Sequence, residues 1–147
     1  MAASLPFIHI RASKFPVLPG EEQELVNPGT YGKALAQYLQ ASLKERAYDV
    51  AFICCEDWGW WVEIKNLPLA TGVCVYATSD LPQSNELCIA IRPAPGRYWS
   101  WRRFRAIDAT PYVTKLFADI SEIVRSDPDV QVLGFPEDFP LADPHPE

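Results

Sequence analysis

The sequence predicts an α+β two-layer sandwich, in which two helices cover one face of an antiparallel sheet of four to six strands. Two segments, 28–46 and 110–126, carry apolar residues at helical spacing. Between them lie short apolar segments whose connections are too brief to hold crossover helices, which favours antiparallel pairing. The chain has 147 residues, of which 48% are hydrophobic, so we expect a single domain over residues 1–134.

The first part of the chain is expected to hold one strand, a loop and one helix. The segment PFIHIRA, residues 6–12, is typical of a strand. After a loop rich in proline, glycine and acids, Asn27 and Pro28 form a cap and first-turn pair, because a proline there has no N–H to leave unbonded. Gly29 and Gly32 weaken this first turn, and they indicate either tight packing or a backbone that a ligand approaches closely.

Four more strands are expected between the helices, over residues 48–55, 60–65, 71–78 and 86–92. The first of them, YDVAFICC, is apolar on both faces and is interpreted as a central strand. The second, WWVEIK, alternates in polarity. Its pattern predicts that Trp60 faces the core and that Trp61 projects from the opposite, wetter face.

The last part of the chain is expected to hold the second helix, a short strand and a tail. The helix over residues 110–126 starts with a Thr-Pro pair and stops at an Asp-Pro pair. The segment VQVLGF, residues 130–135, is interpreted as a last strand. Residues 135–147 are acidic and rich in proline, so we expect an extended or disordered tail.

The cysteines predict buried free thiols. All four lie inside apolar runs, at Cys54, Cys55, Cys74 and Cys88. The only close pair is adjacent, and adjacent strand residues point to opposite faces. Because His9 and His145 are also far apart in sequence, we expect no metal, no cofactor and no disulfide. Reduced thiols, the lack of a signal peptide and the lack of a long apolar run predict a cytoplasmic protein without a membrane partner.

Charge is unevenly distributed along the chain. The formal net charge is −6, yet residues 92–105, RPAPGRYWSWRRFR, carry five arginines and no acid. The rest of the chain therefore sums to −11. Overall acidity argues against broad nucleic-acid binding, although it leaves room for one local basic groove.

The stretch CCEDWGWWVEIK holds three of the five tryptophans. A two-residue turn would force a positive φ on Trp58, so we expect a three-residue loop of Asp57, Trp58 and Gly59 with the glycine in the left-handed position. Trp58 then stands at the hairpin tip. Exposed tryptophans are typical anchors of binding interfaces.

The candidate binding residues form two clusters of opposite charge. They are Glu56, Asp57, Trp58, Trp61 and Glu63 in an acidic cluster, and Trp99, Trp101, Arg102 and Arg103 in a basic cluster. The arginine guanidinium forms bidentate hydrogen bonds with carboxylates and stacks on aromatic rings. One hypothesis is that the clusters pack together, with Arg102, Arg103 or Arg105 paired to the acids. The other is that they form a binding surface.

The run from NPGTYGKALAQYLQASLKERAYDV into EDWGWWVEI resembles a group of small bacterial proteins with no assigned activity. Those proteins share a Gly-x-x-Leu-Ala-x-x-Leu helix followed by a Glu-Asp-Trp-Gly-Trp hairpin. The matching positions are Gly32, Leu35, Ala36, Leu39 and the run from Glu56 to Trp60. The match covers residues 27–65. It implies a bacterial, cytosolic protein and carries no implication for chemistry.

Common enzyme motifs are missing, including the phosphate loop, G-x-S-x-G, H-E-x-x-H and the dinucleotide fingerprint, so no catalytic residue is assigned. The leading hypothesis is a small module that acts by protein–protein interaction. Its narrower form, based on charge and size, is an immunity or antitoxin-like protein that blocks a basic enzyme surface. One alternative is an enzyme or small-ligand protein with a site between the EDWGWW hairpin and residues 97–105. Another is a single-stranded nucleic-acid binder that uses residues 97–105.

Overall fold

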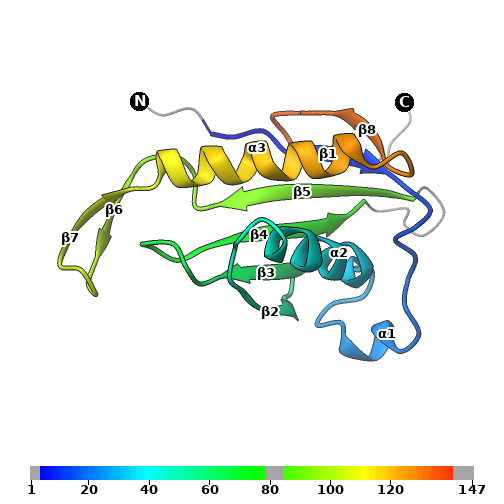
Figure 1. Ribbon diagram of the computed structural model, residues 1–147. Helices are drawn as coiled ribbons and strands as arrows, with labels where there is room; N and C mark the ends of the chain where they lie inside the picture. The colour runs from blue at the N-terminus through cyan, green and yellow to red at the C-terminus, as the bar shows by residue number, and fades with distance from the viewer. Residues whose placement is uncertain (1–3, 79–84, 141–147) are drawn as a thin grey trace, which may run out of the picture.

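The computed structural model describes residues 4–78 and 85–140, and it confirms the predicted α+β class. Six strands form one sheet in the order β2-β3-β4-β5-β1-β8, and every neighbouring pair is antiparallel (Figure 1). The strands are β1 (Ile8–Arg11), β2 (Val50–Cys55), β3 (Trp60–Ile64), β4 (Thr71–Ala77), β5 (Glu86–Arg92) and β8 (Gln131–Gly134). The predicted run of four strands is thus present, and β1 and β8 extend it.

Both long helices, α2 (Lys33–Lys44) and α3 (Thr110–Ser126), pack on one face of the sheet, as predicted (Figure 1). Helix α2 covers β2 and β3, and α3 covers β5 and β8. The fully buried strand residues beneath them include Ile8, Ile10, Val62, Val73, Val75, Leu87 and Ile89. This apolar layer is the main source of stability, at about 25 cal/mol per Å² removed from water. Over residues 4–78 and 85–140, no helix is both long enough and apolar enough to cross a membrane.

Helix α2 begins at Lys33, later than the start predicted at Asn27. The backbone at Gly32 has φ 150°, which is not helical. The cap comes instead from a single-turn helix, α1 (Glu21–Glu24), which the sequence did not predict. The fully buried carboxylate of Glu21 accepts hydrogen bonds from the backbone N–H groups of Gly32 and Lys33 at 2.9 and 3.0 Å. A carboxylate from another element therefore satisfies the free N–H groups at the start of α2.

The two glycines before α2 differ in their surroundings. A Cβ at Gly32 would lie 2.8 Å from the Val75 side chain, whereas a Cβ at Gly29 would meet nothing within 4 Å. Gly32 therefore lies in tight packing against the core, which agrees with the first of the two interpretations offered for these glycines.

Strand β2 lies at the edge of the sheet, so its interpretation as a central strand was wrong. Its apolar residues face two different environments. Val50 is buried beneath the helices, while Phe52 is 43% exposed on the other face. A register shift between these two residues interrupts the pairing with β3. The apolar pattern on both faces thus reflects an apolar outer surface and not a position between two strands.

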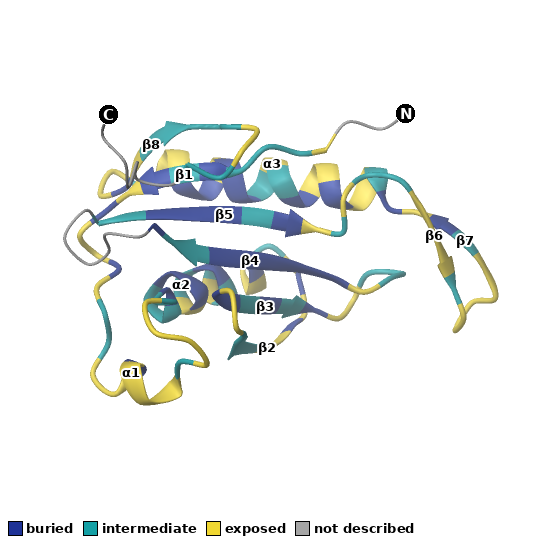
Figure 2. Cartoon of the chain, turned by 180° about the vertical axis from the view of Figure 1, so that it is seen from behind, coloured by how far each residue is buried: buried dark blue, intermediate teal, exposed yellow. Residues whose placement is uncertain are grey.

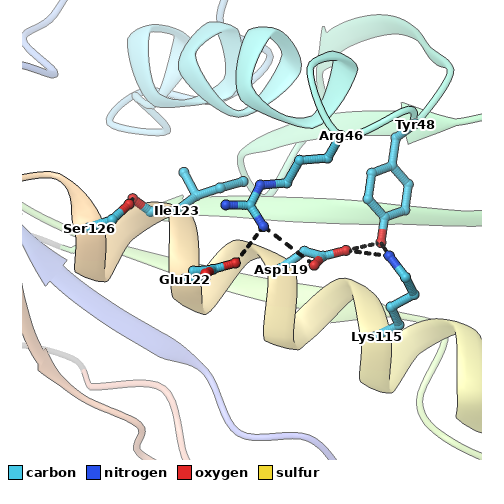
Figure 3. A network of polar contacts seen from close by, with 7 residues as sticks. All are labelled: Arg46, Tyr48, Lys115, Asp119, Glu122, Ile123 and Ser126. Atoms are coloured by element: carbon cyan, nitrogen blue, oxygen red, sulfur yellow. Dashed lines mark hydrogen bonds and ion pairs between the residues drawn. The ribbon is translucent and has the colours of Figure 1, made fainter.

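The C-terminal end of α2 is tied to α3 by a polar network (Figure 3). The carboxylate of Asp119 accepts hydrogen bonds from the Tyr48 hydroxyl at 2.6 Å and from Lys115 at 2.8 Å. Arg46 bridges to Glu122 at 2.7 Å. Burial raises the pKa of Asp119, but the two hydrogen bonds outweigh it and hold that pKa below its usual value. The network fixes the two helices relative to each other.

Two further strands, β6 (Arg97–Ser100) and β7 (Arg105–Asp108), pair into a separate antiparallel ribbon that the sequence did not predict. The ribbon follows β5 and leads directly into α3. It projects beyond one end of the six-stranded sheet and is largely exposed (Figures 1 and 2). We call residues 97–108 the ribbon below.

The first residues of the predicted tail return to the sheet. The Phe7 N–H donates to the Pro136 carbonyl oxygen at 2.9 Å. The Phe139 ring lies 5.7 Å from Phe7 and 5.4 Å from Tyr76, measured between ring centroids. Residues 141–147, the rest of that predicted tail, lie outside the described residues.

Candidate binding surfaces

The turn between β2 and β3 brings the acidic cluster to the end of the hairpin. Cys55 pairs with Trp60, and the Glu56 N–H donates to the Gly59 carbonyl oxygen at 2.7 Å. The turn therefore includes Glu56 in addition to the three loop residues predicted. Gly59 has a φ of 159°, so it does not take the left-handed position that was expected. A Cβ there would lie 2.3 Å from the Val75 carbonyl oxygen, so only glycine fits.

The three tryptophans of this hairpin divide as predicted. Trp60 is 2% exposed and belongs to the core, while Trp58 is 36% exposed at the turn. Trp61 is half-buried and lies on the face of the sheet that the helices leave uncovered, which we call the open face. The hairpin thus anchors the core with one ring and presents two rings to the surface.

Trp61 is held from two sides. Its indole N–H donates to the Glu63 carboxylate at 2.6 Å. Its ring lies directly over the backbone of Gly72 on β4, where a Cβ would come within 2.3 Å of the ring. The absence of a side chain at position 72 therefore makes room for this ring.

A hollow of about 450 Å³ opens beside Trp61 on the open face. Its lining consists of Trp58, Trp61, Cys74, Tyr76 and Arg92. The rings of Trp58 and Tyr76 meet at 5.3 Å between centroids. The Arg92 guanidinium donates to the Tyr76 hydroxyl at 3.4 Å, a long hydrogen bond. A second hollow of about 320 Å³ shares the Trp58–Tyr76 pair and is also lined by Phe7, Ala77 and Phe139.

The cysteines near these hollows are free thiols and poor nucleophiles. Burial raises the pKa of Cys74, although its hydrogen bond to Tyr76 lowers it in part. Burial, followed by the hydrogen bond to Glu56, raises the pKa of Cys54 to about 11. A thiol must ionise before it attacks, so neither residue favours thiolate chemistry at neutral pH.

Two of the three acidic side chains in the predicted cluster accept hydrogen bonds from neighbouring residues of the hairpin. Glu56 accepts from the Cys54 thiol at 3.2 Å, and Glu63 accepts from the Trp61 indole. The Asp57 carbonyl oxygen accepts from the Asn27 side-chain amide at 2.6 Å, while its side chain is exposed. The first two carboxylates are therefore occupied in shaping the hairpin.

The ribbon carries the second predicted cluster. Trp99 is 49% exposed, Trp101 79% and Phe104 72%. The Trp99 ring contacts the other two edge to face, at 5.7 Å from Trp101 and 5.4 Å from Phe104 between centroids, while Trp101 and Phe104 lie 6.4 Å apart in a tilted arrangement. Three aromatic side chains thus form one compact apolar knob at the ribbon tip.

Of the two hypotheses for the clusters, the one in which they pack together was wrong. Among residues 4–78 and 85–140, no ion pair or hydrogen bond joins an arginine of the ribbon to Glu56, Asp57 or Glu63. The physical reason is that the ribbon leaves the sheet at the end opposite the β2–β3 turn (Figures 1 and 2). Arg102 and Arg103 are both exposed, and neither forms an ion pair with an acid in the described parts of the chain.

The separation of the clusters also removes the predicted site between them. The hairpin instead meets Arg92, the first arginine of the basic segment, through Tyr76. Sequence reasoning missed Cys74, Tyr76 and Arg92 as candidate residues. Alternation along β4 and β5 places them on the face of Trp61, but only once the register Trp61–Cys74 and Gly72–Arg92 is known.

No protein-family model, curated protein or solved structure matches the chain. Within the described parts of the chain, no group of three or more histidine, cysteine or acidic residues is placed to hold a metal ion. The surface chemistry of the ribbon and of the open face therefore provides the basis for proposals about function.

Proposed function

We propose that this protein is a small binding module that acts by protein–protein interaction and docks through the ribbon onto an acidic partner surface that contains an apolar pocket. The observation that carries the proposal is the exposed knob of Trp99, Trp101 and Phe104, set among four arginines. Tryptophan and arginine are the residues most enriched at binding hot spots. The resemblance of residues 27–65 to small bacterial proteins supports a bacterial, cytosolic setting.

The backbone of the ribbon tip adds a second argument. Phe104 has a φ of 51°, a left-handed conformation that glycine adopts at lower cost than a bulky residue. Non-glycine residues in this conformation cost about 1–3 kcal/mol and cluster at functional sites. Since the Phe104 ring is 72% exposed, its burial within the chain contributes little free energy to offset this cost. A partner that buries the ring on binding would contribute that free energy.

The charge pattern indicates the chemistry of the partner. Arg97, Arg102, Arg103 and Arg105 are exposed, and none forms an ion pair within residues 4–78 and 85–140. Their positive charge favours an acidic partner. An immunity or antitoxin-like role is the narrower form of this proposal. The blocked enzyme would then present an acidic face to the exposed arginines of the ribbon, in place of the basic surface expected from the overall charge of the chain.

A protein partner is favoured over nucleic acid for two reasons. The chain outside residues 92–105 sums to −11, so the body of the molecule repels a polyanion. The three rings at the tip also pack against one another, with Trp99 edge to face on both others, which suits insertion into a pocket better than the stacking of successive bases.

The test compares immobilised wild-type protein with three variants for capture from the cells that produce it. Trp101→Ala combined with Phe104→Gly removes the knob, and the glycine relieves the left-handed strain, so this variant should remain folded. Arg102→Glu with Arg103→Glu reverses two ribbon charges. Lys44→Glu with Lys65→Glu makes the same change of charge at exposed positions elsewhere. A protein that is captured is then purified, and its affinity is measured by calorimetry.

We expect wild-type protein and the lysine control to bind one acidic protein with equal affinity. Each ribbon variant should weaken that affinity by about 30-fold or more, the loss typical of a hot spot. Equal affinity of the ribbon variants would contradict the proposal. Capture that depends on the ribbon but disappears after nuclease treatment would show a nucleic-acid ligand instead.

A further inference from the structure

A second surface, on the open face of the sheet, has features that protein docking through the ribbon does not use. We propose that the hollow between Trp58, Trp61, Tyr76 and Arg92 binds a small planar aromatic molecule that carries one anionic group. The inference is independent of the ribbon, because none of the five residues that line the hollow belongs to residues 97–108 (the ribbon is seen in Figure 1).

The size and lining of the hollow fit a small ligand. Its volume of about 450 Å³ lies within the range of about 300–1,000 Å³ that is typical of small-molecule sites. Three of its five lining side chains are aromatic. Aromatic rings contact one another best in offset-stacked or edge-to-face arrangements, so a flat aromatic ligand suits these walls.

The charge of the hollow favours an anion. Arg92 is the one charged side chain in the lining, and it pairs with no carboxylate in the described chain segments. Its side-chain hydrogen bonds in those segments go to two uncharged groups, the Tyr76 hydroxyl at the long distance of 3.4 Å and the Cys74 thiol. Burial raises the pKa of Cys74 and of Tyr76, so both stay neutral. A guanidinium fork therefore remains available to a carboxylate or a phosphate.

One wall of the hollow is fixed before any ligand arrives. Glu63 holds the indole nitrogen of Trp61, and Gly72 provides the space beneath its ring. The Glu63 carboxylate, whose charge would otherwise oppose an anionic ligand, is engaged by this hydrogen bond. Walls fixed in advance lose less conformational entropy on binding, which raises affinity.

The test titrates the full-length protein with 2-naphthoate and, as a matched neutral probe, with 2-naphthylmethanol. Two-dimensional ¹H–¹⁵N NMR spectra report separately on the indole N–H groups of the five tryptophans. The variants are Arg92→Gln, which removes the charge, and Trp58→Ala, which removes one wall. Arg97→Gln, an exposed arginine of the ribbon, serves as the control.

We expect 2-naphthoate to shift the Trp58 and Trp61 signals to saturation while Trp99 and Trp101 stay unchanged. Arg92→Gln should lower the affinity for 2-naphthoate by about tenfold or more, because a hydrogen bond between charged groups is lost. The affinity for 2-naphthylmethanol should be nearly unchanged. Trp58→Ala should lower the affinity for both probes, and Arg97→Gln should change neither affinity.

Three results would overturn the inference. The first is no saturable shift of Trp58 or Trp61 at millimolar 2-naphthoate. The second is an equal response at the ribbon tryptophans, which would indicate non-specific apolar contact. The third is unchanged 2-naphthoate affinity in an Arg92→Gln protein whose other NMR signals match those of wild type.

Discussion

The ring of Trp61 lies directly over Gly72, so close that a Cβ at position 72 would come within 2.3 Å of it. Gly72→Ala should therefore displace the ring or separate the two strands, since the same Cβ would also lie 2.7 Å from the Val62 carbonyl oxygen. We expect a loss of about 1–3 kcal/mol in the free energy of unfolding, as for other overpacked sites. Urea denaturation measures this loss.

Gly134 on β8 provides the control for this substitution, because a Cβ there would meet nothing within 4 Å. Gly134→Ala should change the free energy of unfolding by no more than about 0.5 kcal/mol. Equal stability losses in the two alanine variants would show that the contact between Trp61 and Gly72 contributes nothing specific.

The tryptophans of the two clusters should differ in their effect on stability. Trp60 is 2% exposed, so Trp60→Ala should cost about 3–5 kcal/mol. Trp101 is 79% exposed, so the free energy of unfolding of Trp101→Ala should lie within about 0.5 kcal/mol of the wild-type value. Thermal and urea denaturation of the two variants test this contrast. A large stability loss in Trp101→Ala would mean that the ribbon knob is part of the core.

The buried Glu21 should be important for the start of α2. Its carboxylate accepts three backbone hydrogen bonds, from Leu18, Gly32 and Lys33. A glutamine has only one acceptor oxygen, and its NH₂ group would face a backbone N–H donor. Glu21→Gln should therefore lower the free energy of unfolding by about 1.5–3 kcal/mol. Glu45→Gln, at an exposed position, is the matched control and should be nearly neutral. Equal effects of the two substitutions on urea denaturation would argue against this capping role.

The contribution of Asp127 should depend on pH. Hydrogen bonds from Lys14, from Tyr38 and from the Asp129 backbone lower the pKa of Asp127 to about 2. Because this pKa lies below that of the unfolded chain, about 3.9, the ionised carboxylate stabilises the fold above that value by about 2 kcal/mol. The contribution is lost as the pH falls through the folded pKa.

Asp127→Asn should therefore lower the free energy of unfolding by about 2 kcal/mol at neutral pH. The difference in this free energy between the variant and wild type should become smaller between about pH 4 and about pH 2. Asp129→Asn replaces an exposed carboxylate nearby and should show no such trend. Urea denaturation at a series of pH values gives both comparisons. A difference that stays constant as the pH falls would contradict this assignment.

The sequence was most informative where one face of an element is buried. Helices α2 and α3 and the alternation of β3 follow directly from apolar spacing. The ribbon was missed because most of its side chains are exposed: Arg97, Tyr98 and Trp99 all face solvent, and only Ile107 of its two strands is buried, so their polarity shows no alternation. The start of α2 was missed because its cap, Glu21, comes from a different helix.

The open-face hollow could not be assembled from the sequence for a different reason. Arg92 and Tyr76 lie on separate strands, and their contact depends on the register that pairs Gly72 with Arg92. Strand order and register are properties of the whole sheet, so local patterns do not contain them. The exposed positions of Trp58 and Trp61 could be predicted, because the turn and the alternation of β3 are local.

The central claim, that the ribbon docks onto a protein partner, is tested most directly by photo-crosslinking in the cells that produce the protein. The photoreactive residue p-benzoylphenylalanine replaces Trp101 at the ribbon tip or, as the control, Tyr112, an exposed aromatic residue on α3. We predict one discrete protein adduct from position 101, absent from position 112 and lost when Arg102→Glu and Arg103→Glu are added. The claim is contradicted if position 101 gives no adduct, if both positions give the same adducts, or if the adduct at position 101 is nucleic acid.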